Sequence, residues 1–530
     1  MPMYGRASTL YPRTLEMLDQ VDLLDDFLQV GLVARSSVNF DKDGRRVNSR
    51  GWQQVFAQTQ GTFIDYLLNI RLKYSEHLIQ DALEKDREHV LVGWALKDFS
   101  LDADAESYKV SAVIGAVGSD QTKTLKSKYI IGADGGSSLV RRLAGIPFHP
   151  DMTTNRWVRI DGVMKTNMPD SRIGACSIES VTHGNVLWVA LDHGRTRVGF
   201  ALTPEMYNKY GDDMTEEEAK REAIAAVHPF SLEFESVDWY TLYTIKQGVA
   251  ERYTINECVI LAGDACHTHS SGAAQGMNTG VHDAINISWK LGGVLCGWYT
   301  PEILKTYEIE RRPIAQELIR QDKEYSSLIS RGIPDTYKKS GLTANTLLAN
   351  LLHDSASFVL GLGIKYDESQ LNVNTNAGVL VAGCRPPDVL LFRAGGRVPI
   401  RLQQLTPNWG SFWVLVFTGT LEHTRAKLAV LRSHIDSCRS LTNKSAHGAV
   451  NMLTIIDGMK AQGNEALGFE SFGKFYYDPQ GEALTTYGFS EHEGGIAVLR
   501  PDGYLGFAAA LDKGAEIDTY FKQILRDASA

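Results

Sequence analysis

Residues 128–142 (KYIIGADGGSSLVRR) and residues 259–280 (VILAGDACHTHSSGAAQGMNTG) decide how this chain folds. In both stretches a short apolar strand runs into a turn of glycine and aspartate, and a helical pattern follows. Glycine lets a backbone approach a ligand closely, and the free N–H groups at a helix start attract phosphate. Each stretch is therefore a candidate ligand-binding turn between a strand and a helix.

The first turn places Gly132, Asp134 and Gly135 between a strand at residues 128–131 and a helix at about residues 137–144. Asp134 could accept hydrogen bonds from ligand hydroxyl groups, or it could fix the turn. Short glycine patterns also recur by chance, so a strand–helix turn without a ligand is an equally good interpretation of this motif alone.

The second turn places Gly263 and Asp264 at the end of a strand at residues 259–262. An aspartate there is well placed to bind a ribose hydroxyl. The helix that follows, roughly residues 275–296, directs its N-terminal N–H groups and positive dipole end at whatever lies before it. For His267 and His269 we predict structural hydrogen bonds rather than metal ligation, because no third ligand is apparent.

Length, charge and cysteine content indicate the number of domains and exclude some classes of partner. The length of 530 residues suggests two or three domains. The net charge of −9 and the pI of about 5.9 argue against nucleic acid or an anionic membrane as partner. No apolar run is long enough for a membrane span, and the scattered cysteines predict reduced, mostly buried thiols and a cytoplasmic location. The six cysteines are Cys176, Cys258, Cys266, Cys296, Cys384 and Cys438.

Periodicity divides the remaining chain into three regions. Before residue 150 we predict helices at 12–28 and 73–88 and strands at 89–101 and 108–117. The middle region is mostly β, with a hairpin of residues 186–191 and 197–202 and a helix at 215–227 that opens with a capping box. From residue 371 a compact α/β module follows, with strands at 412–417 and 452–456, helices at 425–438 and 515–525, and a hairpin around 500–504.

Together with the upstream element Gly5-Arg6-Ala7, the two turns resemble the DG and GD motifs of class A flavoprotein aromatic hydroxylases. The order and spacing of the three elements are far more specific than any one of them. Resemblance to the fungal phenol 2-monooxygenase branch continues through residues 159–162 (RIDG), 239–247 and 500–504 (RPDGY), and it covers nearly the whole chain.

This resemblance implies a fold of mixed α/β and α+β class. A Rossmann-like FAD-binding domain would occupy residues 1–150 and 250–365, with a β-sheet substrate domain inserted at residues 151–249. A thioredoxin-like domain would occupy residues 371–530. Because that last domain has no CxxC pair, we expect it to serve structure or dimerisation rather than chemistry.

The resemblance also implies roles for individual residues. Arg6 would contact the FAD pyrophosphate, and Asp264, beside Gly263, would bind ribityl or ribose hydroxyls. Asp134 and Gly135 belong to the turn implicated in both FAD and NADPH binding. Tyr243 matches an active-site tyrosine that faces substrate and flavin, although a half-buried strand aromatic is the commoner fate of a tyrosine. The backbone expected to hold the flavin ring is that of Ala274, Gln275, Gly276, Met277 and Asn278.

The chain departs from the family pattern at several positions. No G-x-G-x-x-G turn precedes Gly5, so we expect an FAD-binding domain that is incomplete at its N-terminal side. Ser8 stands where the phenol hydroxylases have an aspartate, and a serine cannot act as a carboxylate base. Substitutions in the flavin loop and at one flavin contact leave open a substrate other than simple phenol. These further exchanged positions are Leu72, Ser271, Gly272 and Ala274.

The implied function is an FAD- and NADPH-dependent monooxygenase that hydroxylates a phenolic or related aromatic compound. With O2, the reduced flavin would form a C4a-hydroperoxide that transfers OH to the ring, while Tyr243 hydrogen-bonds the phenol or the flavin. The partners would be a small aromatic substrate, O2 and a second copy of the chain. Two alternatives stay open: a flavin-free descendant that is a binding protein or a non-redox isomerase or cyclase, and a truncated inactive product.

Overall fold

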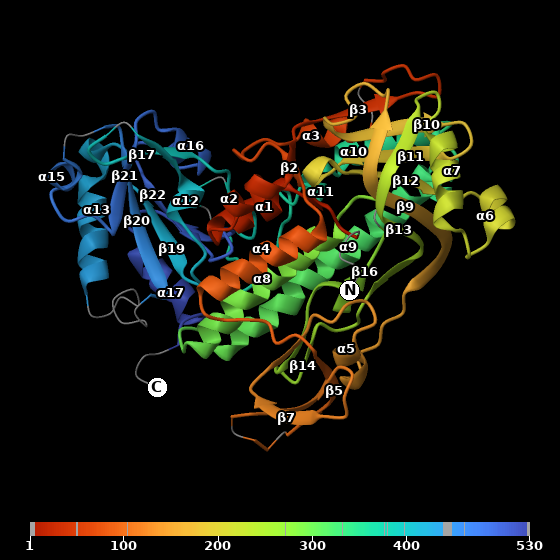
Figure 1. The fold of residues 1–530 in the computed structure, drawn as a ribbon. Coiled ribbons are helices and arrows are strands. Elements are labelled where there is room, and N and C mark those ends of the chain that lie inside the picture. The colour runs from red at the N-terminus through yellow and green to blue at the C-terminus, as the bar shows by residue number, and fades with distance from the viewer. Residues whose placement is uncertain are drawn as a thin grey trace.

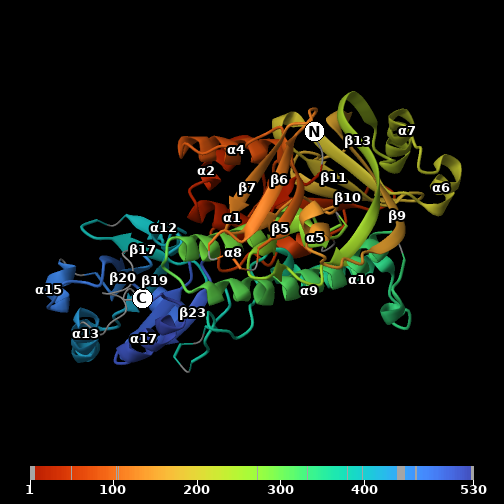
Figure 2. The same cartoon turned by 90° about the horizontal axis from the view of Figure 1, so that it is seen from below.

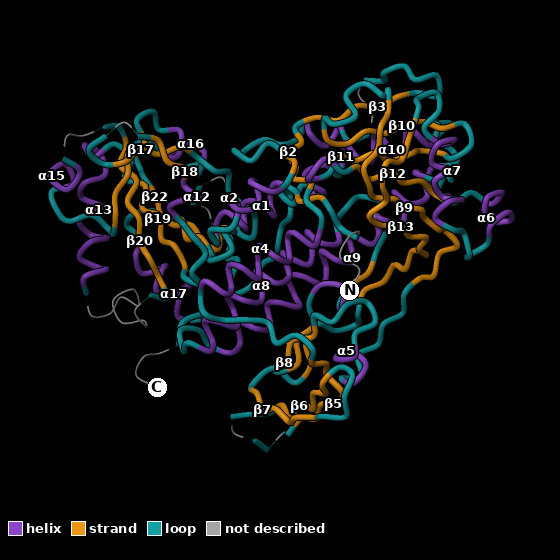
Figure 3. Tube along the Cα trace, viewed as in Figure 1, coloured by secondary structure: helices purple, strands orange, loops and turns teal. Residues whose placement is uncertain are grey.

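The computed structural model describes residues 6–48, 51–102, 104–105, 107–270, 272–330, 332–375, 377–378, 380–396, 398–437, 448–459 and 462–526, with residues 152–155 and 245 as backbone only. Two long helices, α8 (Gly276–Leu295) and α9 (Lys305–Ile329), run side by side through the middle of the molecule (Figures 1 and 2). A large β-sheet lies at one end of them and the C-terminal α/β domain at the other (Figure 3). The described part of the chain therefore has a seven-stranded sheet at each end of a helical centre, together with three smaller sheets.

The large sheet has seven strands in the order β16-β13-β9-β12-β11-β10-β3. Its strands are β3 (Ser36–Phe40), β9 (Asp151–Thr166), β10 (Gly174–Ser180), β11 (Gly184–Ala190), β12 (Thr196–Ala201), β13 (Leu232–Val249) and β16 (His267–Thr268). Both edge strands come from outside residues 151–249, since β3 pairs in parallel with β10 and β16 pairs with β13. The division into domains stays a prediction, and we propose that β3 belongs with the substrate sheet.

The two faces of this sheet differ in character. On one face Ile160, Val198 and Trp188 are buried in an apolar cluster that α7 (Glu216–Ala226) covers. Alternate residues on the same strands, among them Trp157 and Arg159, point to the opposite face, because successive side chains of a strand alternate. That second face is where the candidate site lies.

The two glycine–aspartate turns belong to a smaller sheet. Strand β8 (Ile130–Gly132) pairs in parallel with β15 (Val259–Leu261), and β14 (Thr254–Ile255) pairs on the far side of β15. Because Gly132 lies opposite Leu261, both turns leave the same end of the sheet. The helices that follow them are α5 (Leu139–Leu143) and α8, so both predicted strand–turn–helix units are confirmed.

One predicted helix in the N-terminal region is wrong. Residues 12–28 form two helices, α1 (Pro12–Gln20) and α2 (Leu24–Val30), because Asp22 between them adopts a left-handed φ of 59°. The strand expected from residue 89 begins at Trp94. The other elements before residue 130 are β1 (Thr9–Leu10), β2 (Leu32–Ala34), α3 (Gln53–Phe56), β4 (Leu67–Asn69), α4 (Leu72–Lys85), β5 (Trp94–Leu101), β6 (Val110–Ala116) and β7 (Thr122–Ser127).

The predicted capping box of α7 is confirmed: the Thr215 side chain accepts from the backbone N–H of Glu218, and the Glu218 side chain accepts from the backbone N–H of Thr215. The turn of the predicted hairpin between β11 and β12 is also present, as a short 3-10 segment at Asp192–Gly194. The other helices in this half are α6 (Pro204–Tyr210), α10 (Ala344–Asp354) and α11 (Ala356–Val359).

The C-terminal domain is built on a second seven-stranded sheet, in the order β18-β17-β21-β20-β19-β22-β23. Its three central strands, β19, β20 and β21, are parallel, whereas β22 and β23 form the predicted hairpin. The elements are β17 (Leu390–Arg393), β18 (Pro399–Arg401), α12 (Leu402–Leu405), β19 (Phe412–Phe417), α13 (Leu421–Asp436), β20 (Val450–Asp457), α15 (Gly463–Leu467), β21 (Lys474–Asp478), α16 (Glu482–Thr486), β22 (Gly495–Leu499), β23 (Leu505–Ala509) and α17 (Gly514–Lys522).

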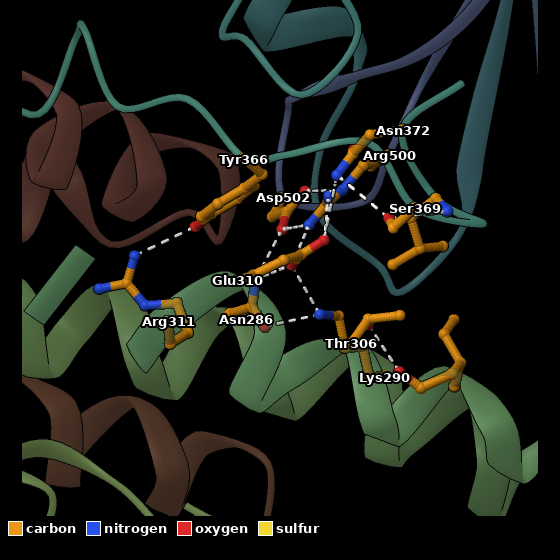
Figure 4. A network of polar contacts seen from close by, with 12 residues as sticks. Asn286, Lys290, Thr306, Glu310, Arg311, Tyr366, Ser369, Asn372, Arg500 and Asp502 are labelled. Carbon is orange, nitrogen blue, oxygen red and sulfur yellow. Dashed lines mark hydrogen bonds and ion pairs between the residues drawn. The ribbon is translucent and has the colours of Figure 1, made fainter. Parts of the chain in front are cut away.

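The hairpin of residues 500–504 fixes this domain to the central helices (Figure 4). The guanidinium of Arg500 pairs with Glu310 of α9 and, at 2.7 Å, with Asp502. Lys290 of α8 reaches the same Glu310 carboxylate at 2.7 Å. All four charged side chains are buried, so the RPDGY motif acts here as a docking element.

Two further expectations are that most cysteines are buried and that no segment spans a membrane. Of the cysteines within the ranges given above, Cys176, Cys258 and Cys266 are buried, Cys384 is partly buried and Cys296 is exposed. Cys438 lies outside the described residues. Among the described helices, none is both long and apolar enough to cross a bilayer.

Candidate active site

The two glycine–aspartate turns lie next to each other at the end of the small sheet. The backbone N–H of Ala262 donates to the Gly132 carbonyl at 3.0 Å. Arg141 then bridges the turns, because its guanidinium donates to the carbonyls of Ala265 at 2.7 Å and Gly136 at 2.8 Å. Motifs separated by about 130 residues in the chain thus form one continuous surface.

Asp134 fixes the first turn. Its carboxylate accepts from the backbone N–H groups of Leu139 at 2.6 Å and Val140 at 3.1 Å, and from the Ser138 hydroxyl. Partial burial raises the pKa of Asp134, but these hydrogen bonds outweigh it and lower the pKa below its ordinary value. Of the two roles that the sequence left open, the structure shows the turn-fixing one. Gly135 supplies the positive φ of 83° that the turn requires.

Asp264 in the second turn is placed differently. Its side chain is exposed, and the described part of the chain offers its carboxylate no hydrogen bond. The turn itself is rigid, since the N–H of Gly263 donates to the buried carboxylate of Asp283 at 3.1 Å. Burial would raise the pKa of Asp283, but Arg311 at 2.7 Å and His267 at 2.8 Å hold it at about 2. Asp264 is therefore a free acceptor on a fixed support.

Helix α8 begins with backbone donors that face no acceptor. The described residues provide no partner for the N–H groups of Gly276, Met277 and Asn278. The side chains around them are committed elsewhere: Gln275 donates to the Val359 carbonyl at 2.7 Å, and Asn278 binds Thr9 and Tyr11, each at 2.9 Å.

Three buried polar atoms on the connection before this helix also have no partner within the described residues, namely His267 Nδ1, Thr268 Oγ1 and His269 Nε2. The other ring nitrogens of the histidine pair, His267 Nε2 and His269 Nδ1, make the predicted structural hydrogen bonds, to Asp283 and the Ser270 carbonyl. Ala274 precedes the helix with a positive φ of 51°. Ser271 lies outside the described residues.

The segment from Arg6 to Ser8 is tied to the large sheet by Arg197. That guanidinium donates to the Arg6 carbonyl at 2.6 Å and to the Ser8 hydroxyl at 3.1 Å. Its other nitrogens bind Asp161 in a bidentate pair, at 2.7 and 2.8 Å, and both charged side chains are buried. The Arg6 side chain itself is exposed. Gly5 lies outside the described residues.

A cavity open to solvent, with about 610 Å³ of empty space when the adjoining solvent is included, lies between the second face of the large sheet and helices α9 and α10. Its wall is mainly apolar and aromatic, and Arg159 is the one charged side chain among the described residues that line it. Gly272, in the loop that leads to α8, also lines it, so the cavity extends to the connection that precedes this helix. Side chains at the wall include Trp52, Trp157, Leu187, Ala201, Tyr325, Ile329, Leu348 and Leu352.

Tyr243 lies beside this cavity. It is half-buried on β13, opposite Trp157 of β9, and packs against the cluster of Trp157 and Ala201, which both line the cavity. The structure therefore brings Tyr243 to the cavity edge rather than into its wall. Leu72 opens α4 directly after Arg71, whose guanidinium is bound by Asp192 and Asp238, each at 2.8 Å.

Sequence reasoning missed the parts of the site that depend on pairing between strands. Arg159 and Trp157 could have been found from the alternation along residues 157–161, which places every second side chain on one face. Trp52 carries no local signal, because α3 meets the sheet only through the tertiary fold.

Comparison with known proteins agrees with this geometry. The family described as "FAD binding domain" matches residues 2–322, and "Phenol hydroxylase, C-terminal dimerisation domain" matches residues 456–529. The chain belongs to the FAD binding domain family. It is 29% identical to a phenol 2-monooxygenase (fsqG) of Aspergillus fumigatus, over 75% of this chain and 70% of that protein.

This FAD-binding-domain protein is also similar to a second curated relative and to a solved structure. It is 25% identical to a 3-hydroxybenzoate 4-monooxygenase of Comamonas testosteroni, over 98% of this chain and 89% of the relative. A solved complex of aklavinone-11 hydroxylase with FAD and aklavinone shares the fold, with a TM-score of 0.72 at 18% identity, covering 99% and 92% of the two chains. The expected fold class, including an FAD-binding α/β region and a phenol-hydroxylase-type C-terminal domain, is confirmed.

The residues present fit the cofactor of the family. A flavin ring offers acceptor atoms, and the start of α8 supplies three N–H groups without acceptors. A ribityl chain offers hydroxyl groups, and Asp264 is a carboxylate without a partner in the described part of the chain. The unpartnered His269 Nε2 and Thr268 Oγ1 lie on the same strand-to-helix connection.

Proposed function

We propose that this protein is an FAD-dependent monooxygenase that uses NADPH and O2 to hydroxylate a phenolic or related aromatic compound. The observation that carries the proposal is the aromatic-walled cavity whose lining runs from the large sheet to Gly272, in the loop that leads to α8, whose first N–H groups have no partner within the described residues. A ring bound in that cavity would lie beside a flavin held by α8. Membership of the FAD binding domain family and the named monooxygenase relatives support this assignment.

The residues that would hold the cofactor follow from the site. The N–H groups of Gly276 to Asn278 would bind the acceptor edge of the flavin ring. Asp264 would bind ribityl or ribose hydroxyls, and the exposed Arg6 would bind the pyrophosphate. Asp134 and Gly135 would shape the neighbouring turn, where we place the contact with NADPH. The chemistry that bound FAD would supply is the acceptance of reducing equivalents from NADPH and the activation of O2.

The protein would supply binding, orientation and exclusion of water. The apolar walls around Trp52 and Leu352 would hold the ring and keep water from it. Tyr243 would orient the substrate hydroxyl through its phenolic OH from the cavity edge. At the position where phenol hydroxylases have an aspartate, the Ser8 hydroxyl accepts from Arg197, so no carboxylate base stands there.

The deciding experiment is a visible absorption spectrum of the purified protein before and after addition of FAD. A bound-flavin spectrum that bleaches with NADPH, followed by an aromatic product heavier by one oxygen atom, is the expected result. A well-folded protein that stays colourless with FAD would refute the proposal for this chain. The hypothesis that would then remain is a flavin-free binding protein, isomerase or cyclase.

The C-terminal domain suggests a homodimer. Its match to a dimerisation domain and the missing CxxC pair both favour an assembly role over redox chemistry. Sedimentation velocity at several concentrations would test this, and a monomer at micromolar concentration would contradict it.

A further inference from the structure

We infer that Arg159 binds a carboxylate on the substrate, so that the preferred substrate is an aromatic acid rather than a neutral phenol. This inference rests on the proposed function, because it takes the cavity to be the substrate site. It concerns a residue for which the sequence resemblance implied no role.

The Arg159 side chain lies flat on the sheet surface. Arg159 of β9 faces Gly199 of β12 directly across the strand pair. A Cβ atom at Gly199 would stand 2.4 Å from Nη1 and 2.8 Å from Cζ of Arg159, so only glycine leaves room for the guanidinium. The ring of Trp157 lies 4.5 Å from the same Cζ. Glycine and tryptophan thus hold the guanidinium at the cavity wall in a fixed orientation.

The charge around Arg159 favours an anion. The guanidinium is only 3% exposed, and the described lining of the cavity contains no carboxylate. Asp161 is the nearest acidic neighbour along β9, and both of its carboxylate oxygens accept hydrogen bonds from Arg197. Burial is the largest influence on the pKa of Arg159 and lowers it. Tyr243 and Asp161 raise this pKa and the positive charge of Arg197 lowers it, but the net shift is downward, so the surroundings disfavour the charge. An anion entering the cavity would offset this cost.

The remaining wall supplies other donors and an apolar slot. The indole N–H of Trp157 is buried with no hydrogen-bond partner among the described residues, and Ser177 and Asn185 add polar groups to the wall. Trp52, Leu348 and Leu352 form apolar surface of the kind that packs against a flat ring. A cavity of this composition suits a small aromatic molecule with an acceptor-rich substituent. A planar carboxylate matches the planar guanidinium in geometry as well as charge.

Ligand binding tests the inference without any turnover. The probes are 3-hydroxybenzoate and 3-methylphenol, which share ring and hydroxyl and differ in carboxylate against methyl. Calorimetric titration of the purified full-length chain, saturated with FAD where it binds, should give at least about tenfold tighter binding of the acid. Arg159→Met should abolish the preference. Gly199→Ala should weaken it while keeping the arginine, because the added Cβ displaces the guanidinium.

Controls separate a binding role from a structural one. Leu348→Ala should weaken both probes to a similar extent, because it removes only apolar wall. Arg159→Lys should keep part of the preference, since charge remains and the planar fork is lost. If Arg159→Met does not fold, Gly199→Ala and Arg159→Lys still decide the question. Equal affinity for the two probes in the unaltered chain, or a preference that survives in Arg159→Met, would overturn the inference.

The result is distinguishable from failure of the proposed function. An acid preference that depends on Arg159, in a protein that forms no hydroxylated product, would refute the monooxygenase assignment alone. Hydroxylation of a neutral phenol with no acid preference would refute the role of Arg159 alone.

Discussion

Arg500 and Glu310, 190 residues apart in the chain, form a fully buried bidentate ion pair, with Nη1 to Oε1 at 2.6 Å and Nη2 to Oε2 at 2.9 Å. The pair joins the C-terminal domain to helix α9 (Figure 4). Lys290 and Asp502 complete the network, and Trp289 donates its indole N–H to Asp502 at 3.1 Å. The contact between these two parts of the molecule therefore combines a buried ion-pair network with apolar packing, in which Phe412 meets Trp289 and Tyr299.

Glu310→Gln should lower the free energy of unfolding by about 3–5 kcal/mol, because it leaves Arg500 and Lys290 buried with less negative charge to balance them. Chemical denaturation followed by the fluorescence of tryptophan, including Trp289 in the network, would measure this. The control is Arg35→Gln, which breaks an exposed pair with Asp65 and should cost less than about 1 kcal/mol. Similar losses in both variants would contradict the central role of the buried pair.

Acid should destabilise the protein through Glu16. Burial would raise the pKa of Glu16, but Arg385 and Arg13 hold it at about 2, against an ordinary value of 4.5. The unfolded chain therefore takes up the proton more readily, and the stability contributed by this group is lost as the pH falls from about 4.5 toward 2. Between pH 5 and pH 3 the loss amounts to about 2 kcal/mol.

Glu16→Gln should therefore show a smaller fall in unfolding free energy between pH 5 and pH 3 than the unaltered chain. Denaturant titrations at a series of pH values would measure both slopes. Identical slopes would show that Glu16 does not carry this part of the acid sensitivity. Glu310 and Asp283, whose pKa values also lie at about 2, contribute to the slope that remains.

The sequence predicts local elements of this fold well and long-range pairing poorly. The capping box of Thr215 and Glu218 lies within one helical turn, and β19 is a continuous apolar run, so neither needs the rest of the chain. By contrast, β3 joins a sheet whose other strands begin more than 100 residues later, and the break at Asp22 depends on a single backbone conformation. Such features are decided by packing, which periodicity does not encode.

In the candidate site, too, the sequence predicts the local motifs and misses the residues that long-range strand pairing brings together. The two glycine–aspartate turns are visible because glycine and aspartate at a strand end have a backbone reason to be there. The sequence could not decide between the two roles of Asp134, since both need the same residue at the same place. Arg159 became a candidate only when Gly199, 40 positions later, was found opposite it.

Substitution of Asp264 and of Asp134 should have different effects, the first on FAD affinity and the second on stability. Asp264→Ala should weaken FAD binding about tenfold or more with unchanged thermal stability, because its carboxylate has no partner within the described residues. Asp134→Ala should lower stability by about 1 kcal/mol, because Leu139 and Val140 lose their acceptor at the start of α5. Flavin fluorescence titration and thermal unfolding would measure the two effects. A loss of stability in Asp264→Ala would contradict its assignment as a free acceptor.

Tyr243→Phe should slow hydroxylation about tenfold while leaving the flavin content nearly unchanged, because it removes one hydrogen bond to the substrate and keeps the packing against Trp157 and Ala201. Product formation per bound flavin, with flavin measured by absorption, is the quantity to compare. Tyr240→Phe is the matched control on the same strand. Its hydroxyl donates to the Met214 carbonyl at 2.5 Å, on the face of the sheet away from the cavity.

Turnover in Tyr240→Phe should therefore stay close to that of the unaltered protein. Equal rates in all three proteins would leave Tyr243 as a packing residue of β13 and move the search for the substrate-orienting group to the cavity wall. A loss of flavin in Tyr243→Phe would point instead to cofactor binding. Only a slower hydroxylation at full flavin content assigns the Tyr243 hydroxyl to the substrate, since packing and cofactor retention are then both intact.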